Sequence, residues 1–134
     1  MAKTLTYGMV GGGPDAFIGD AHRRAIGLDG TAVIAAGVFS RNREKSLQTA
    51  EELGISTDRC YEDYRAMARA EGEREDGIDF VVVVTPNQSH YEICRAFLEA
   101  GIHVACDKPV TTTYGQAKEL EALAEEKGLL FMVT

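Results

Sequence analysis

The stretch YGMVGGGPDAFIGDAHRRA, residues 7–25, decides the fold of this 134-residue chain. Three consecutive glycines follow an apolar, strand-like segment and precede a segment with helical spacing. Glycines at such a junction make a tight turn and let backbone N–H groups at the start of the helix approach a phosphate. The stretch therefore predicts a strand–turn–helix unit that binds a dinucleotide. A plain strand-to-helix turn is the alternative on these glycines alone.

The remainder of the chain continues this alternation of apolar runs and amphipathic helical stretches. IDFVVVV, residues 78–84, is the clearest strand, because its β-branched run does not alternate with polar residues, as in a strand covered on both faces. We predict one α/β domain, residues 1–134, with a doubly wound, mostly parallel sheet between two layers of helices. The expected strands are 4–10, 32–39, 78–84, 102–106 and 129–134, the expected helices are 20–28, 42–54, 89–100 and 113–128, and a short strand followed by a helix is expected within 59–72.

Charge and cysteine content exclude several classes of function. The net charge of −7 argues against a nucleic-acid partner and against an anionic membrane surface, since both need a basic face. No apolar run approaches the roughly 18 residues of a membrane helix, and the first residues lack a secretory signal. Three cysteines without a CxxC motif indicate reduced thiols in the cytoplasm. The three histidines lack metal-ligand spacing, so we expect no metal site.

The glycine stretch fits two fingerprints. A G-x-G-x-x-A pattern uses Gly11, Gly13 and Ala16, whereas an extended loop takes Gly19 as its third glycine. Asp15 is unusual in this turn, because its carboxylate would repel a phosphate if it pointed inward.

The end of the second expected strand carries cations where an NAD site usually carries an acid. Ser40 and Arg41 stand at the strand end, and Lys45 follows shortly after. Asp or Glu at this place holds ribose hydroxyls, whereas cations suit a 2′-phosphate, so the sequence favours NADP(H) over NAD(H). The alternative is a solvated helix start capped by Ser40 or Asn42.

Two further motifs carry a resemblance to a known family. The segment 85–113, TPNQSHYEICRAFLEAGIHVACDKPVTTT, resembles the T-P-N-x-x-H and E-K-P signatures of the glucose–fructose oxidoreductase, inositol dehydrogenase and rhizopine-catabolism (Gfo/Idh/MocA) family. The glycine stretch looks like the extended-loop variant of the same family's fingerprint. The resemblance covers essentially all 134 residues, but only the family's N-terminal, nucleotide-binding Rossmann half. Asp107 stands where the family more commonly has Glu.

The resemblance implies roles for individual residues. It assigns the pyrophosphate loop to Gly11, Gly13, Phe17 and Ile18, the adenosine ribose to Ser40 and Arg41, the nicotinamide side to Thr85, Pro86, Asn87 and His90, and the catalytic lysine to Lys108, with His22 matching a family histidine after the glycine loop. Lys45 is added as a cofactor-binding cation from its charge.

The chemistry of these residue types agrees with the implied roles. Ligands of α/β sheets bind at the carboxyl ends of strands, where both Thr85 and Lys108 are expected. An ammonium there can stabilise the oxygen of a developing carbonyl or relay its proton during hydride transfer. The alternatives are a surface lysine for Lys108 and a helix-starting residue for His90. His103 is expected to be a satisfied core or edge residue of its strand, and Cys94 and Cys106 are expected to be small buried packing residues.

We therefore expect the NAD(P)-binding half of an oxidoreductase that acts on a sugar, polyol or related alcohol or carbonyl substrate. The resemblance implies a second domain that supplies the substrate pocket, a further acid/base histidine and a homo-oligomer interface. The chain stops on the apolar strand LLFMVT, so we expect a fragment that binds cofactor without turnover. An NADP(H)-sensing or protein-binding module is the alternative, and it has no need for Lys108. A methyltransferase-like site is a third possibility. Such a site should carry an acid where Ser40 and Arg41 stand, so these two residues argue against it.

Overall fold

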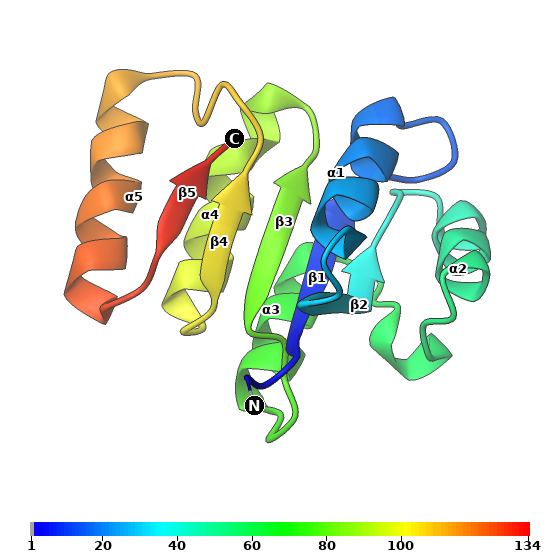
Figure 1. The fold of residues 1–134 in the computed structure, drawn as a ribbon. Coiled ribbons are helices and arrows are strands. Elements are labelled where there is room, and N and C mark those ends of the chain that lie inside the picture. Colours follow the sequence, from blue (N-terminus) through cyan, green and yellow to red (C-terminus); the bar gives the residue numbers. More distant parts are fainter. Residues whose placement is uncertain (1) are drawn as a thin grey trace.

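In the computed structural model, which describes residues 2–134, five parallel strands form one sheet in the order β2-β1-β3-β4-β5. Figure 1 shows this sheet and the helices that connect its strands. The elements are β1 (Leu5–Gly11), α1 (Phe17–Gly27), β2 (Ala32–Val38), α2 (Arg43–Glu52), the 3-10 turn η1 (Thr57–Arg59), α3 (Tyr64–Glu73), β3 (Phe80–Val84), the 3-10 turn η2 (Asn87–Ser89), α4 (His90–Glu99), β4 (His103–Cys106), α5 (Tyr114–Lys127) and β5 (Phe131–Val133).

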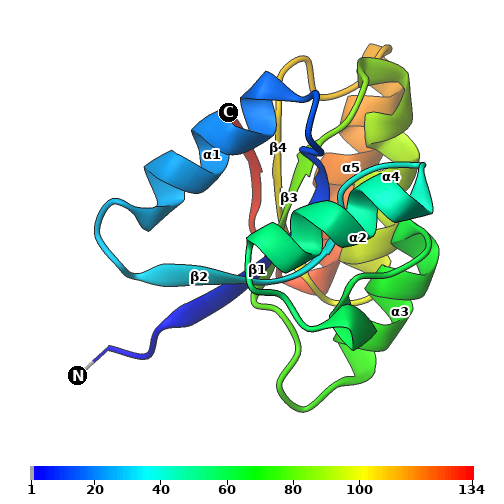
Figure 2. The ribbon, with the colours of Figure 1, turned by 90° about the vertical axis from the view of Figure 1, so that its right-hand side faces the viewer.

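Helices cover the two faces of the sheet unequally. Figure 2 shows α1 on one side and α3, α4 and α5 on the other, with α2 beside the β2 edge. The larger core lies under α3, α4 and α5 and includes Met67, Phe97 and Leu120. The smaller core lies under α1 and α2. These layers confirm the predicted three-layer α/β fold. None of the helices in residues 2–134 combines the length and apolarity needed to cross a bilayer.

The valine run of β3 explains why the strand is buried on both faces. Val81 and Val83 point into the larger core, and Val82 and Val84 into the smaller one. All four are 6% exposed or less, so the absence of polar alternation reflects two covered faces.

The predicted short strand before α3 is wrong. Only a single bridge between Gly37 and Cys60 forms there. Arg43 donates to the carbonyl of Cys60 (2.6 Å), and Asp63 caps α3 by accepting from the N–H of Ala66. The N–H of Phe39, which would extend the ladder beyond the bond from the Tyr61 N–H to the carbonyl of Gly37, is instead donated to the Ser46 hydroxyl (3.0 Å), and the helix begins immediately afterwards.

Strand order places two loops side by side. The chain runs from β1 outward to β2, and then crosses back to β3 on the other side of β1. Such a switch point opens a crevice at the carboxyl ends of the two strands. Gly11 at the end of β1 is in register with Val84 at the end of β3. The glycine loop and the loop after Val84 therefore share one edge of the sheet.

Candidate functional site

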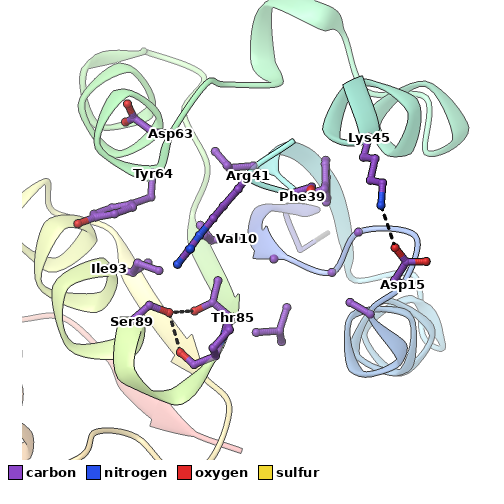
Figure 3. A pocket seen from close by; sticks show the side chains of 18 of the residues that line it. Val10, Asp15, Phe39, Arg41, Lys45, Asp63, Tyr64, Thr85, Ser89 and Ile93 are labelled. Atoms are coloured by element: carbon purple, nitrogen blue, oxygen red, sulfur yellow. Dashed lines mark hydrogen bonds and ion pairs between the residues drawn. The ribbon is translucent and has the colours of Figure 1, made fainter. Parts of the chain in front are cut away.

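A cavity of about 580 Å³ opens at the carboxyl ends of β1, β2 and β3, within the size range of small-molecule sites. Figure 3 shows the side chains that line it. The lining comes from the glycine loop, the end of β2 and the start of α2, the segment before α3, and the end of β3 with the start of α4. Its residues are Val10, Gly11, Gly12, Gly13, Pro14, Asp15, Ala16, Val38, Phe39, Ser40, Arg41, Lys45, Glu62, Asp63, Tyr64, Val84, Thr85, Pro86, Ser89 and Ile93.

The glycine loop needs its glycines for two separate reasons. Gly11 and Gly12 have φ values of 92° and 77°, which side-chain-bearing residues rarely adopt. At Gly13 a Cβ atom would lie 2.7 Å from the carbonyl oxygen of Phe39, so a side chain would push the loop off the end of β2. The loop is therefore a backbone surface that a ligand can approach closely.

Helix α1 presents free backbone donors to this loop. Its N-cap residue, Ala16, provides no side-chain hydrogen bond, whereas the N-caps Asn42, Asp63 and Thr113 of α2, α3 and α5 each accept one. Uncapped N–H groups at a helix N-terminus favour an anion. The helix starts at Phe17 rather than at the predicted residue 20, which brings this end directly onto the loop.

Arg23 fixes the loop from behind. Its Nη1 donates to the carbonyl of Gly12 (3.0 Å) and contacts the sulfur of Met9 (3.2 Å). Sequence reasoning missed this residue. The sequence has two consecutive arginines here, Arg23 and Arg24. Only the way α1 is turned shows that Arg23, and not Arg24, contacts the glycine loop.

The end of β2 and the start of α2 carry the cations expected from the sequence. Figure 3 shows the Arg41 side chain extending into the cavity toward Ile93 and Ser89. Lys45 Nζ forms an ion pair with Asp15 of the glycine loop at 3.2 Å. This pair offsets the acid that would repel a phosphate, because Asp15 points to Lys45. We call the part of the cavity lined by Ser40, Arg41 and Lys45 the Arg41 end.

A buried carboxylate supports the wall of the Arg41 end that Glu62, Asp63 and Tyr64 form. Glu71 of α3 has a side chain that is 0% exposed. It accepts from Arg59 Nε (3.0 Å), from Arg59 Nη2, from the hydroxyl of Tyr61 (2.6 Å) and from the N–H of Ile78 (3.1 Å). Burial, followed by the hydrogen bond to Glu71, raises the pKa of Tyr61 to about 12. The network holds the segment that leads into Glu62, Asp63 and Tyr64, and no sequence motif pointed to it.

The loop after β3 bears the T-P-N motif. Thr85 and Pro86 line the cavity, whereas Asn87 is exposed at the start of η2 and lies outside the lining. The Ser89 hydroxyl donates to the carbonyl of Pro86 (2.6 Å) and hydrogen-bonds the Thr85 hydroxyl (2.7 Å). These bonds fold the loop back onto the start of α4.

His90 lies beneath this loop rather than on the cavity wall. The residue is 1% exposed. Its Nε2 lies 2.8 Å from the carbonyl oxygen of Thr85, and its Nδ1 lies 2.8 Å from that of Pro109. Both ring nitrogens therefore have backbone partners, and neither is free to contact a cofactor. The expected contact between His90 and a cofactor stays a prediction.

The D-K-P segment follows β4 on the neighbouring side. Asp107 donates its N–H to Val83 O (3.0 Å), and its carboxylate lies 3.9 Å from Nε2 of His22 on α1. Lys108 is exposed, and its peptide bond to Pro109 is cis. Lys108 sits beside the T-P-N loop because β4 pairs with β3, although it does not line the cavity. We call this part of the site, with Thr85 and Pro86, the Lys108 end.

The remaining two predicted residues occupy different surroundings. Phe17 is 84% exposed at the start of α1. Ile18 packs against the smaller core and so anchors the helix. Neither side chain lines the cavity, so an anion could meet only the backbone N–H groups of Phe17 and Ile18 at the start of α1, and their role in binding stays a prediction.

These observations fit a dinucleotide. The glycine loop is so close to β2 that a Cβ at Gly13 would collide with backbone atoms. The start of α1 offers uncapped N–H donors, and Arg41 brings a cation into the cavity. Such a donor set suits a pyrophosphate flanked by ribose and a further phosphate or hydroxyl.

Comparison with known proteins supports this picture. Residues 5–134 match the model of a family described as "Oxidoreductase family, NAD-binding Rossmann fold". The uncharacterized oxidoreductase YfiI of Bacillus subtilis is 43% identical across the whole chain, which corresponds to 34% of that protein.

Solved structures agree with the family model. An inositol dehydrogenase homologue from Azotobacter vinelandii complexed with NAD+ superposes with a TM-score of 0.96 at 39% identity, over 100% of this chain and 34% of that one. The complex of such a homologue from the same organism with NADH and myo-inositol gives the same TM-score and identity over 35% of its length. The chain thus spans about a third of the length of these relatives. It belongs to the Gfo/Idh/MocA family of oxidoreductases and forms that family's NAD-binding Rossmann domain.

Proposed function

We propose that this chain is the cofactor-binding part of an enzyme that transfers a hydride between a nicotinamide cofactor and a sugar, polyol or related alcohol or carbonyl. One observation carries the proposal: the glycine loop and the exposed Lys108 stand at the carboxyl ends of strands that meet at one edge of the sheet. The Azotobacter homologue, solved with NADH and myo-inositol, supports the substrate class.

The residues of this chain divide the work of such a reaction. The glycine loop and the start of α1 bind the pyrophosphate, and the T-P-N loop orients the nicotinamide side. A bound nicotinamide cofactor supplies the hydride acceptor or donor. Lys108 reaches the substrate oxygen, where its ammonium stabilises the negative charge that builds up as a carbonyl forms or is reduced, and relays the proton.

The substrate pocket, the oligomer interface and a further acid/base group belong in this proposal to parts outside the third of the relatives' length that residues 1–134 span. Residues 1–134 are accordingly expected to bind cofactor without turning over substrate. The free, buried cysteines suit a reducing compartment such as the cytoplasm.

NADP(H) is the proposed cofactor, because the Arg41 side chain at the end of β2 extends into the cavity and a cation at that strand end suits a 2′-phosphate. A guanidinium can form a bidentate, charge-assisted pair with a phosphate. The Azotobacter homologue was solved with NAD+, so the preference depends on residues of this chain such as Arg41.

A titration with NADPH and with NADH, followed by nicotinamide fluorescence, tests the proposal. We expect tighter binding of NADPH, and a loss of roughly 10- to 100-fold in NADPH affinity in Arg41→Ala with little change for NADH. Arg95→Ala, which removes an exposed arginine paired with Glu99 on α4, is the matched control and should leave both affinities unchanged. Equal binding of the two cofactors would overturn the NADP preference. Binding of neither would overturn the proposed function.

A further inference from the structure

A buried histidine joins the two loops of the Lys108 end. His90 begins α4 and is 1% exposed. Its ring stands between the carbonyl oxygen of Thr85 and the carbonyl oxygen of Pro109, each 2.8 Å from a ring nitrogen. Thr85 belongs to the T-P-N loop and Pro109 to the D-K-P segment, so one side chain touches both motifs from below.

The two partners determine the protonation of the ring. A carbonyl oxygen only accepts hydrogen bonds, and a neutral imidazole carries a single N–H. A neutral ring would therefore leave one nitrogen lone pair facing an oxygen lone pair at 2.8 Å in a buried site. Only the doubly protonated ring donates to both carbonyls, so the geometry requires an imidazolium.

A cysteine of the neighbouring strand balances this buried charge when it is deprotonated to the thiolate. Cys106 of β4 and Cys94 of α4 are buried in the larger core, and Asp107 follows Cys106. Interaction with Cys106, and then the hydrogen bonds to the two carbonyls, raise the pKa of His90 to about 9 against the opposing effect of burial. Interaction with Cys94, and then with His90, lowers the pKa of Cys106 to about 6, although burial and Asp107 oppose this. Interaction with Cys106 raises the pKa of Cys94.

We propose that His90 is a positioning residue, a doubly protonated ring that ties the T-P-N loop to the D-K-P segment and so fixes where Lys108 stands relative to the nicotinamide side of the cavity. This inference rests on the proposed function for the identity of the ligand. His90 contacts neither cofactor nor substrate; it acts through the two carbonyls. The Arg41 end does not depend on it, because His90 touches no residue there.

The charge of the ring is tested directly by long-range 1H–15N spectra of the histidine side chains. We expect both ring nitrogens of His90 to be protonated from neutral pH up to about pH 8, below its pKa of about 9. His103, whose Nδ1 accepts from the N–H of Leu130 (2.9 Å), serves as the internal reference for a ring that cannot be protonated at Nδ1 while it keeps this bond. A single protonated nitrogen on His90 at neutral pH would overturn the proposal, and this measurement needs no variant.

The positioning role is tested with two ligands that differ only at the nicotinamide. ADP-ribose shares the adenosine, pyrophosphate and second ribose of NADH but lacks the nicotinamide. In His90→Gln, which keeps one donor, we expect ADP-ribose affinity to stay within about 2-fold and NADH affinity to fall roughly 10-fold. His103→Gln is the matched control and should change neither affinity.

The outcomes separate this inference from the proposed function. If the wild-type protein binds neither of these ligands nor NADPH, the proposed function fails, and with it the positioning role, whatever the ring spectrum shows. If the wild type binds both ligands and folded His90→Gln keeps the wild-type ratio of the two affinities, the positioning role alone is overturned. A drop of equal size for both ligands would also overturn it, since that result indicates a general structural defect.

Discussion

The two ends of the site rest on buried side chains of opposite character. Glu71 lies behind the wall of the Arg41 end, and His90 lies beneath the loops of the Lys108 end, with 2% and 1% of each residue exposed. Glu71 accepts hydrogen bonds from a guanidinium, a phenol and a backbone N–H. His90 faces two carbonyl oxygens instead.

This difference decides which end of the site has a buried support whose charge changes with pH. The carboxylate of Glu71 is matched by Arg59, which stays charged at any ordinary pH. The ring of His90 faces two carbonyls, which do not titrate, and it loses its proton as the pH rises through its pKa of about 9. The Arg41 end is therefore a fixed wall, and the Lys108 end is held by a support that titrates.

The largest expected effect comes from breaking the support of the Arg41 end. Glu71→Gln removes the buried partner of Arg59, and removal of one member of a buried pair costs about 3–5 kcal/mol of unfolding free energy. Denaturant unfolding measures it. Glu92→Gln removes an exposed carboxylate 3.9 Å from Arg65 and should cost about 0–1 kcal/mol. Equal losses in the two variants would show that the buried network is not a support.

A smaller effect is expected where both ends share one backbone. In Gly19→Ala the new Cβ would lie 2.4 Å from the Cα of Gly12, so α1 must move away from the glycine loop. We expect a loss of about 1–3 kcal/mol in stability and weaker binding of NADPH and ADP-ribose alike.

The same helix offers the control for Gly19→Ala. Gly27 also lies in α1, and no atom lies within 4 Å of the position that a Cβ would take. Gly27→Ala should therefore raise the free energy of unfolding by up to about 1 kcal/mol and leave binding unchanged. Unaltered binding in Gly19→Ala would contradict the role of this close contact.

The smallest expected effect is the loss of the Tyr61 hydrogen bond to Glu71, whose contribution to stability depends on pH. Tyr61→Phe removes one hydrogen bond to Glu71 and should cost about 1 kcal/mol near neutral pH. The pKa of Tyr61 is raised from 10.0 to about 12 in the folded protein, so its contribution is complete below pH 10 and is lost as the pH rises through 12.

The deficit of Tyr61→Phe relative to wild type should therefore narrow between pH 10 and 12, as followed by urea unfolding over that range. Tyr114→Phe alters a tyrosine that is 78% exposed and should follow the wild-type profile. A deficit that stays constant to pH 12 would contradict the coupling of Tyr61 to Glu71.

Sequence patterns predicted the fold well, because they record how strands are covered. The unbroken valines of β3 are explained by a strand that is buried on both faces. The glycines between β1 and α1 are explained by a turn in which backbone segments approach closely. The segment around Cys60 was predicted wrongly, because Cys60 and Tyr61 suit a strand but the N–H of Phe39 that a longer ladder would need is donated to the Ser46 hydroxyl.

The site was predictable where backbone geometry or strand ends place it, as for Gly11, Gly13, Arg41 and Thr85. It was not predictable where a contact joins residues far apart. Glu71 lies in a charged run typical of a solvated face, and nothing local shows that its side chain turns inward to Arg59. For His90, the motif showed that the residue matters, whereas only the fold shows that it faces Pro109.

The pairing of β1 with β3 also bears on how the molecule assembles. Thr6 and Asp79, 73 residues apart, exchange hydrogen bonds where the two strands begin, and the strands end at Gly11 and Val84. Contacts of such long sequence separation form slowly, after their loop-closure entropy has been overcome. The glycine loop and the T-P-N loop thus meet only in the nearly complete fold. A ligand that spans both binds the native chain and no partly folded form, and so it raises the free energy of unfolding of the whole domain.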